Sequence, residues 1–130
     1  MTAALNILLV DDEEGIRMIA RMGLERIGGH QVQTSVNGQV ALDLLRDDGN
    51  DSVRPDVILL DVMMPELDGP SLLRAIKADP KLADLDVIFL TAKVGVEGDG
   101  PFLALGAKGV IHKPFDPLTL AADVERRLGS

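Results

Sequence analysis

The sequence predicts an α/β fold in which helices cover both faces of a parallel sheet. Five short runs rich in β-branched residues and leucine indicate strands, at residues 6–10, 31–35, 56–60, 86–90 and 109–112. Helical patterns of apolar residues lie between these runs. Because parallel neighbours need crossover connections, this alternation favours a parallel sheet. The runs at 56–60 and 86–90 are almost entirely apolar, which is typical of central strands, whereas 31–35 alternates as an edge strand does.

Length and composition indicate a single domain that spans residues 1–130. A chain of 130 residues with 46% hydrophobic and 26% charged residues can bury one sizeable core. The absence of cysteine excludes disulfide bonds and thiolate chemistry. The net charge of −8 disfavours direct binding of nucleic acid and favours cationic partners and metal ions. The first residues match neither a signal peptide nor a membrane span, so we expect a cytoplasmic location.

The segment between the first two strands is expected to form an amphipathic helix within residues 13–29 that ends at Gly28-Gly29. The apolar face of this helix comprises Ile16, Ile19, Ala20, Gly23, Leu24 and Ile27. Shorter helical faces follow the second, third and fifth strands. They comprise, in that order, Val40, Ala41, Leu44 and Leu45; Leu72, Leu73 and Ile76; and Leu120, Ala121, Val124 and Leu128.

The segment after the fourth strand is rich in glycine. Gly95, Gly98 and Gly100 precede Pro101. Glycine costs about 0.5–1 kcal/mol in a helix interior, so we expect this helix to begin late, near Pro101, after a mobile loop. The glycine spacing fits neither a dinucleotide-binding loop nor a P-loop. The polar stretch 46–55 is expected to form another exposed loop.

Polar side chains stand where four of the expected strands end. Asp11 and Asp12 follow the first strand, Asp61 the third, Thr91 the fourth, and Lys113 the fifth. Singly, each of these residues has an ordinary explanation as a helix cap, a turn residue or a surface charge. Because the carboxyl ends of parallel strands meet at one edge of the sheet, the set predicts a functional site there.

Three carboxylates at one sheet edge repel one another, which either raises the pKa of at least one of them or keeps the loops loose. A divalent cation with oxygen ligands relieves this repulsion, and Mg²⁺ is the ion that binds carboxylates together with phosphate. These residue types therefore favour a site for a divalent cation.

Short motifs occur in a specific order along the chain. They are Asp11-Asp12, Asp61 followed by VMMPELDG, Thr91-Ala92, LGAKG before the fifth strand, and KPF at residues 113–115. As a set they resemble the response-regulator receiver domain, the CheY-like family of two-component signalling, over nearly the whole chain. The resemblance implies a flavodoxin-like three-layer sandwich of five strand–helix units, (βα)5, with the parallel sheet order 2-1-3-4-5.

The resemblance also implies which residues carry the chemistry. Asp61 would accept a phosphoryl group from a histidine kinase or a histidine-containing phosphotransfer protein. Mg²⁺, or Mn²⁺ in its place, would be held by Asp12, Asp61 and the backbone carbonyl of Met63. Asp11 would act on the metal largely through bound water.

Residues around the acceptor are expected to stabilise the phosphoryl group and to couple phosphorylation to a conformational change. By the same resemblance, Thr91 and Lys113 would contact the phosphoryl group, and Ala92 would leave a path for the phosphodonor. The Lys113–Pro114 bond would be cis, although the residues alone are equally compatible with a trans bond. Val110 stands where the family often has an aromatic switch residue. The usual coupling between the threonine and that aromatic residue is therefore not expected here.

The resemblance implies that the phosphorylated chain binds its partner through the fourth helix, the fifth strand and the fifth helix. Without the aromatic residue, we hypothesise that phosphorylation orders the region of the fourth helix itself. Met63 and Lys93 offer no obvious group to orient an attacking water molecule, which favours slow self-hydrolysis. No enzyme activity is expected beyond self-catalysed phosphorylation and dephosphorylation.

Three other functions are compatible with this fold class. A Mg²⁺-dependent aspartyl-phosphate phosphohydrolase is disfavoured because Asp61 does not begin a D-x-D motif. A flavin or dinucleotide binder is disfavoured because the chain lacks a phosphate loop and aromatic residues to sandwich a ring. A non-phosphorylated docking module is disfavoured because every acceptor-site residue is present. The sequence fits a stand-alone regulator and a segment of a longer one equally well, and it names neither kinase nor output partner.

Overall fold

Parallel strands form one five-stranded sheet in the order β2-β1-β3-β4-β5. The strands are β1 (Asn6–Val10), β2 (Gln31–Ser35), β3 (Val57–Asp61), β4 (Asp86–Thr91) and β5 (Gly109–His112). The expected α/β class and the strand order implied by the resemblance are therefore confirmed. β3 includes Asp61 and β4 includes Thr91, so these polar side chains belong to the strands rather than to the loops that follow.

This computed structural model describes residues 4–47, 54–92 and 98–129. Most of the expected polar loop after the second helix lies outside these ranges. Lys93 and Gly95 also lie outside them, as does most of the glycine-rich loop that the sequence predicts before the fourth helix.

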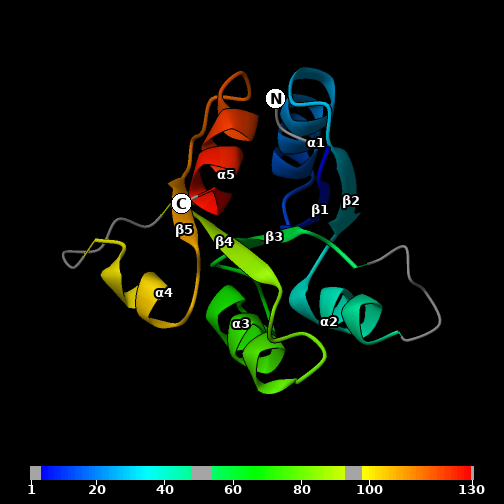
Figure 1. Cartoon of the computed structure of the whole chain (residues 1–130), viewed down its shortest axis with the longest axis vertical. Coiled ribbons are helices and arrows are strands. Elements are labelled where there is room, and N and C mark those ends of the chain that lie inside the picture. Colours follow the sequence, from blue (N-terminus) through cyan, green and yellow to red (C-terminus); the bar gives the residue numbers. More distant parts are fainter. Residues whose placement is uncertain (1–3, 48–53, 93–97, 130) are drawn as a thin grey trace.

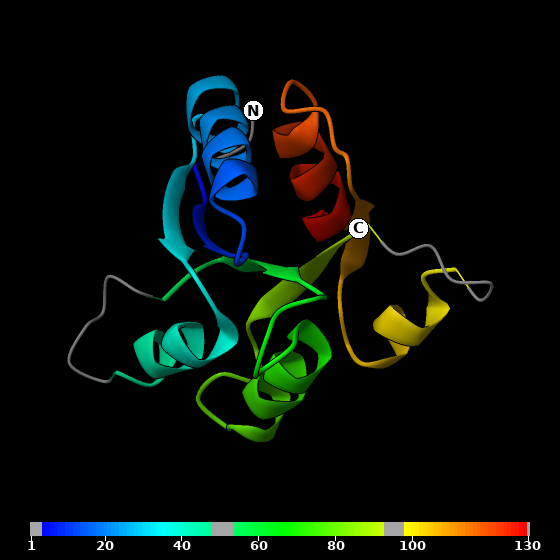
Figure 2. The same cartoon turned by 180° about the vertical axis from the view of Figure 1, so that it is seen from behind.

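Helices cover both faces of the sheet and complete a three-layer sandwich (Figures 1 and 2). One face carries α1 (Glu14–Met22), which continues as the π-helical turn η1 (Gly23–Ile27), and α5 (Leu120–Leu128). The other face carries α2 (Gly38–Arg46), α3 (Gly69–Ala78) and α4 (Gly100–Ala104). Among the described residues, no helix has the length and apolar character needed to cross a membrane.

Each face of the sheet has its own hydrophobic core. Ile7 and Leu9 of β1 belong to the core under α1 and α5, whereas Leu8 and Val10 belong to the core under α2, α3 and α4. The two sets alternate because successive side chains of a strand point to opposite faces. Every residue of β3 is buried, as expected for a central strand, and β2 shows the alternating burial of an edge strand. Burial on both faces thus fixes the position of the carboxyl end of β3.

The buried face of the first helix differs from the prediction at two positions. Gly23 and Leu24 are buried as predicted, but Ile19 is 41% exposed and Ile27 is 50% exposed. At Gly23 the chain changes to π-helical hydrogen bonding, in which the Gly28 N–H donates to the Gly23 carbonyl at 3.1 Å. The wider turn moves the residues that follow out of the 3.6-residue spacing, which accounts for the exposure of Ile27. Ile19 lies at the rim of the buried face.

The other helices follow their predicted patterns at most positions. α3 buries the apolar residues predicted for it, and α5 buries Leu120, Ala121 and Val124 but leaves Leu128 half-buried. In α2, however, Val40 is 41% exposed and Leu42 takes the buried position. α4 spans only Gly100–Ala104, with Pro101 in its first turn, which confirms the predicted late start of this helix.

The first turn of α3 is held directly against the end of β3. The Asp68 side chain accepts a hydrogen bond from the Ser71 N–H at 2.8 Å, and this bond holds the pKa of Asp68 below its usual value. The Gly69 N–H donates to the Val62 carbonyl at 3.1 Å. A Cβ atom at Gly69 would lie 2.4 Å from the backbone oxygen of Asp61. Only glycine therefore permits this approach of α3 to the strand that carries Asp61.

Glu66, in the loop between β3 and α3, has a left-handed backbone with a φ of 67°. This conformation is unfavourable for a residue with a Cβ atom but costs glycine little. We expect Glu66→Gly to raise the free energy of unfolding by about 0.5–1 kcal/mol in urea denaturation. Glu66→Ala is the matched control, because it removes the carboxylate and keeps the backbone strain. An equal gain from both variants would show that the charge of Glu66, not its backbone, is unfavourable.

Candidate functional site

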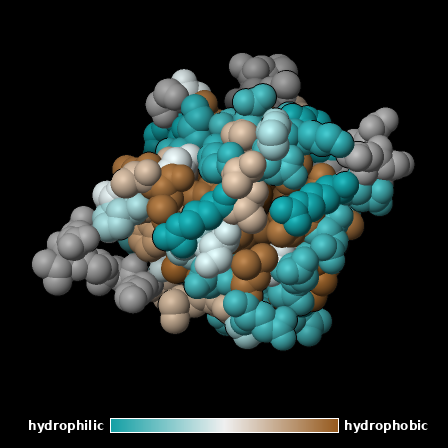
Figure 3. Space-filling model, turned by 90° about the horizontal axis from the view of Figure 1, so that it is seen from below, coloured by the Kyte–Doolittle hydropathy of each residue, from teal (hydrophilic) through white to brown (hydrophobic). Residues whose placement is uncertain are grey.

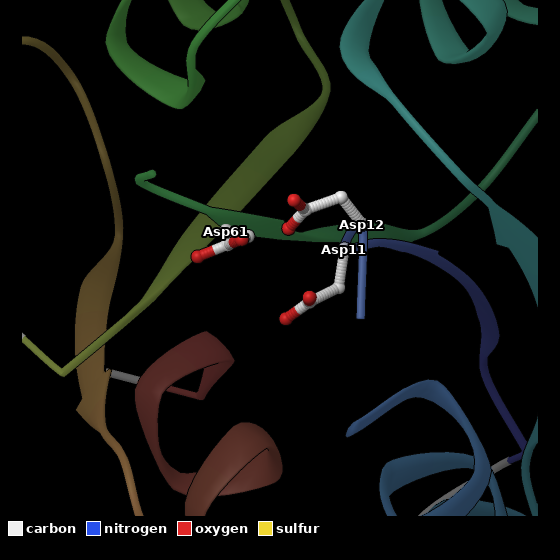
Figure 4. Close-up of side chains that lie close together, drawn as sticks. All are labelled: Asp11, Asp12 and Asp61. Carbon is white, nitrogen blue, oxygen red and sulfur yellow. The ribbon is translucent and has the colours of Figure 1, made fainter. Parts of the chain in front are cut away.

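The candidate site lies at the carboxyl edge of the sheet, where β1 and β3 are neighbours. Asp11 and Asp12 directly follow β1, and Asp61 is the last residue of β3. In the sheet β2 lies on one side of β1 and β3 on the other, so the strand order reverses between β1 and β3, the place where parallel α/β sheets typically bind ligands. Figure 4 shows the three carboxyl groups gathered there from the ends of the two strands. The prediction that these acids converge is borne out by their positions.

The acidic cluster has the donor atoms of a site for a hard metal ion. Carboxylate oxygens of Asp11, Asp12 and Asp61 all lie within 4.8 Å of one another. Asp11 and Asp61 are buried, whereas Asp12 is exposed and accessible from solvent. Mg²⁺ prefers oxygen ligands, keeps several of its waters and binds through one or two carboxylates. The three residues therefore fit such an ion.

Lys113 supplies the positive charge of the site. Its Nζ lies 2.7 Å from Asp11 Oδ2 and 3.3 Å from Asp61 Oδ1. Burial raises the pKa of Asp61 to about 6, the charge of Asp11 adds to this rise, and Lys113 opposes it. Burial alone would lower the pKa of Lys113, but the two carboxylates outweigh it and the pKa rises. Lys113 consequently remains an ammonium group at neutral pH.

Hydrogen bonds hold the two buried acids in place, at their carboxylates and at the Asp11 main chain. The Glu13 N–H donates to Asp11 Oδ1 at 2.9 Å, and Arg17 Nη1 donates to the Asp11 carbonyl at 2.7 Å. The Met63 N–H lies 3.3 Å from Asp61 Oδ1. These contacts orient the acids before any ligand arrives, which favours precise binding of a charged group.

The remaining predicted residues lie around this cluster. Thr91 is buried at the end of β4, one residue beyond the position that pairs with Asp61, and Ala92 after it is exposed. The Lys113–Pro114 bond is cis, as the resemblance implies. Val110 is only 2% exposed and belongs to the core beneath α2, α3 and α4.

One contact near the site was missed at the level of sequence. Nε2 of His112, the last residue of β5, lies 2.9 Å from Oδ1 of Asp99, the residue before α4. Asp99 stands among glycines and carries no motif, so the sequence holds no indication of this pairing. The contact joins the end of β5, next to Lys113, to the start of α4.

Comparison with known proteins identifies relatives over almost the whole chain. The family model described as response regulator receiver domain matches residues 7–125. Response regulator Rre1 of Synechocystis is 35% identical over 98% of this chain and 53% of that protein. The phosphate regulon transcriptional regulatory protein PhoB of Pseudomonas aeruginosa is 37% identical over 95% of this chain and 52% of that protein. The chain thus spans about half the length of these curated relatives.

Solved structures of similar fold agree with this result. The chemotaxis protein CheY4 of Vibrio cholerae superposes with a TM-score of 0.82 and 31% identity, over 95% of this chain and 98% of that chain. The phosphorylated cyanobacterial phytochrome response regulator RcpA gives a TM-score of 0.79 and 29% identity, over 95% and 91% of the two chains. With its sheet order and acidic cluster, the chain belongs to the response regulator receiver domains, the signalling domains of two-component systems.

Proposed function

We propose that Asp61 accepts a phosphoryl group from a phosphohistidine of a histidine kinase or a histidine-containing phosphotransfer protein. The observation that carries this proposal is a buried carboxylate, 3% exposed, held 3.3 Å from the Lys113 ammonium and beside two further acids. RcpA, a structural relative, is described as phosphorylated. A carboxylate in this setting can act as a nucleophile whose product, an acyl phosphate, lies among groups that neutralise its charge.

In the proposed transfer, one oxygen of the Asp61 carboxylate attacks the phosphorus atom. A new O–P bond forms as the P–N bond to the donor imidazole breaks. The electron pair of the P–N bond goes to the ring nitrogen, which takes up a proton. The products are an aspartyl phosphate and a free histidine, so no water or oxidant is consumed.

The surrounding residues stabilise the phosphoryl oxygens during this step. The Lys113 ammonium neutralises charge on one side, and the Thr91 hydroxyl donates a hydrogen bond on the other. Asp12, Asp61 and the backbone carbonyl of Met63 would hold Mg²⁺ or Mn²⁺, with Asp11 acting through water. When bound, the ion relieves repulsion among the carboxylates and neutralises charge on the phosphoryl group.

We further propose that phosphorylation alters partner binding through α4, β5 and α5. The Thr91 hydroxyl, bonded to the phosphoryl group, would draw the end of β4 toward Asp61. Arg127 of α5 already donates from Nε to the Val110 carbonyl at 3.2 Å, so α5 follows any movement of β5. In this proposal residues 1–130 act as one cytoplasmic receiver domain without direct contact to nucleic acid or membrane. Met63 is 65% exposed and lacks a group to orient water, which favours slow loss of the phosphoryl group.

Incubation with acetyl phosphate and Mg²⁺, followed by intact mass spectrometry, tests the proposal. The wild-type chain is expected to gain one phosphoryl group, and Asp61→Asn none, because the nucleophile is removed. Asp43→Asn is the matched control, since it removes an exposed carboxylate from α2 and should be labelled like the wild type. Chelation of Mg²⁺ with EDTA should suppress labelling. Labelling that persists in Asp61→Asn, or is absent from the wild type, would contradict the proposed function.

A further inference from the structure

A polar contact ties the start of α4 to the end of β5. Nε2 of His112 lies 2.9 Å from Oδ1 of Asp99. A carboxylate oxygen can only accept, so the imidazole Nε2–H is the donor. Asp99 makes no capping bond to the backbone of α4, so its side chain serves this contact rather than the helix.

The partner of Asp99 is also the residue that pairs with Thr91. Thr91 and His112 are opposite each other in the register of β4 and β5, and the Lys113 N–H donates to the Thr91 carbonyl at 2.8 Å. Thr91 and Asp99 therefore both contact the end of β5. A shift of Thr91 toward a phosphoryl group on Asp61 would strain the pairing of β4 with β5 and, through His112, the contact to Asp99.

α4 has few other contacts that hold it to the sheet. It spans five residues, none of which is buried. Phe102 is its main anchor, with its ring centroid 5.2 Å from that of Phe89, whereas Leu103 is 47% exposed. Figure 3 shows that hydrophobic residues are exposed at several places on the face that α2, α3 and α4 form, including the α4 side. A helix with so little burial is sensitive to the loss of a single polar contact.

We propose that the Asp99–His112 contact is a latch that holds α4 against β5 in the unmodified chain and opens when Asp61 is phosphorylated. This release of α4 is the opposite of the ordering that the sequence-based hypothesis expects, and hydrogen exchange of α4 with and without phosphorylation distinguishes the two. This inference rests on the proposed function and adds the element that links the acceptor to α4. Coupling between two sites is reciprocal. A variant without the latch should therefore favour the same released state of α4 that phosphorylation of Asp61 favours. His112 directly precedes Lys113, so the latch begins at the residue next to the one that contacts Asp61.

The latch is tested with Asp99→Ala, His112→Ala, the double variant and His112→Gln. The side chains of the pair are 44% and 39% exposed, so loss of the contact should change an equilibrium by about two- to five-fold. Hydrogen exchange of the Phe102 and Leu103 amides, which donate to the Asp99 carbonyl, is expected to accelerate by that factor in both single variants. The rate of labelling by acetyl phosphate should rise by a similar factor.

The double variant and the glutamine variant make the test specific. If the two side chains act only through each other, the double variant should exchange no faster than either single variant. His112→Gln keeps an N–H donor near the place of Nε2 and should remain close to the wild type. Additive effects of the two single variants, or no change in exchange and labelling, would overturn the latch while Asp61 is still labelled. Absence of labelling in the wild type would instead overturn the proposed function, and with it the opening of the latch on phosphorylation. The two failures can therefore be told apart.

Discussion

Gly69→Ala is expected to lower the free energy of unfolding by about 2–3 kcal/mol and to slow labelling of Asp61 by about 100-fold. The added Cβ would lie 2.4 Å from the Asp61 carbonyl oxygen and 2.9 Å from the Val62 Cα. Both neighbours are backbone atoms of a buried strand end, so α3 or the strand must move. A displacement of about 1 Å at a reacting group can cost about 100-fold in rate. Urea denaturation and acetyl phosphate labelling measure the two effects.

Gly15→Ala is the matched control for this prediction. Gly15 is an exposed helical residue of α1, and a Cβ there would meet no atom within 4 Å. Alanine is more favourable than glycine in a helix by about 0.5–1 kcal/mol, so this variant should be more stable than the wild type. If the free energy of unfolding falls in Gly69→Ala and rises in Gly15→Ala, crowding at Gly69 explains the difference. A Gly69→Ala protein with unchanged stability and labelling would show that α3 can withdraw from β3 at no cost.

In buffer with EDTA, Asp61→Asn is expected to raise the free energy of unfolding by about 2 kcal/mol near neutral pH. Burial and the charge of Asp11 raise the folded-state pKa of Asp61 from 3.8 to about 6. The folded chain therefore holds this proton more tightly than the unfolded chain does. The stability that Asp61 contributes is fully present below its unfolded pKa and is lost as the pH rises through about 6. One unit of pKa shift corresponds to about 1.4 kcal/mol. Asparagine does not ionise, so the variant never places a charged carboxylate at this buried position.

Urea denaturation of both proteins from about pH 4 to about pH 8 measures this effect. The difference in stability between Asp61→Asn and the wild type should be small at the acid end. It should grow as the pH rises from the unfolded pKa of Asp61, 3.8, through its folded pKa of about 6. Asp43→Asn makes the same change in net charge at an exposed position, and its effect should stay within about 0.5 kcal/mol. A difference for Asp61→Asn that does not vary with pH would contradict the raised pKa.

The strands and the place of the site could be predicted because both depend on local patterns. A period of two residues marks strands such as Gln31–Ser35, and the carboxyl ends of parallel strands meet at one edge whatever the loops between them do. Asp61 and Thr91 could thus be assigned to the site before their neighbours were known. The short α4 followed from the conformational cost of glycine, which is also a local property.

Other features depend on residues that are distant along the chain. The π-helical turn that exposes Ile27 interrupts a helical pattern that would otherwise bury it. The left-handed backbone of Glu66 breaks a local preference, and only a chain constrained at both ends by β3 and α3 would adopt it. Neither feature leaves a mark in hydrophobic periodicity.

The sequence by itself determined the order of the elements, the central place of β3 and the gathering of Asp11, Asp61, Thr91 and Lys113 at one edge of the sheet. Tertiary structure alone decided how these groups pair: Lys113 reaches Asp11 at 2.7 Å across 102 positions of sequence, and His112 reaches Asp99. The physical reason is that secondary structure follows from short-range periodicity and backbone preference. The pairing of side chains, and the pKa values that result, depend on distances and burial that only the packed chain defines.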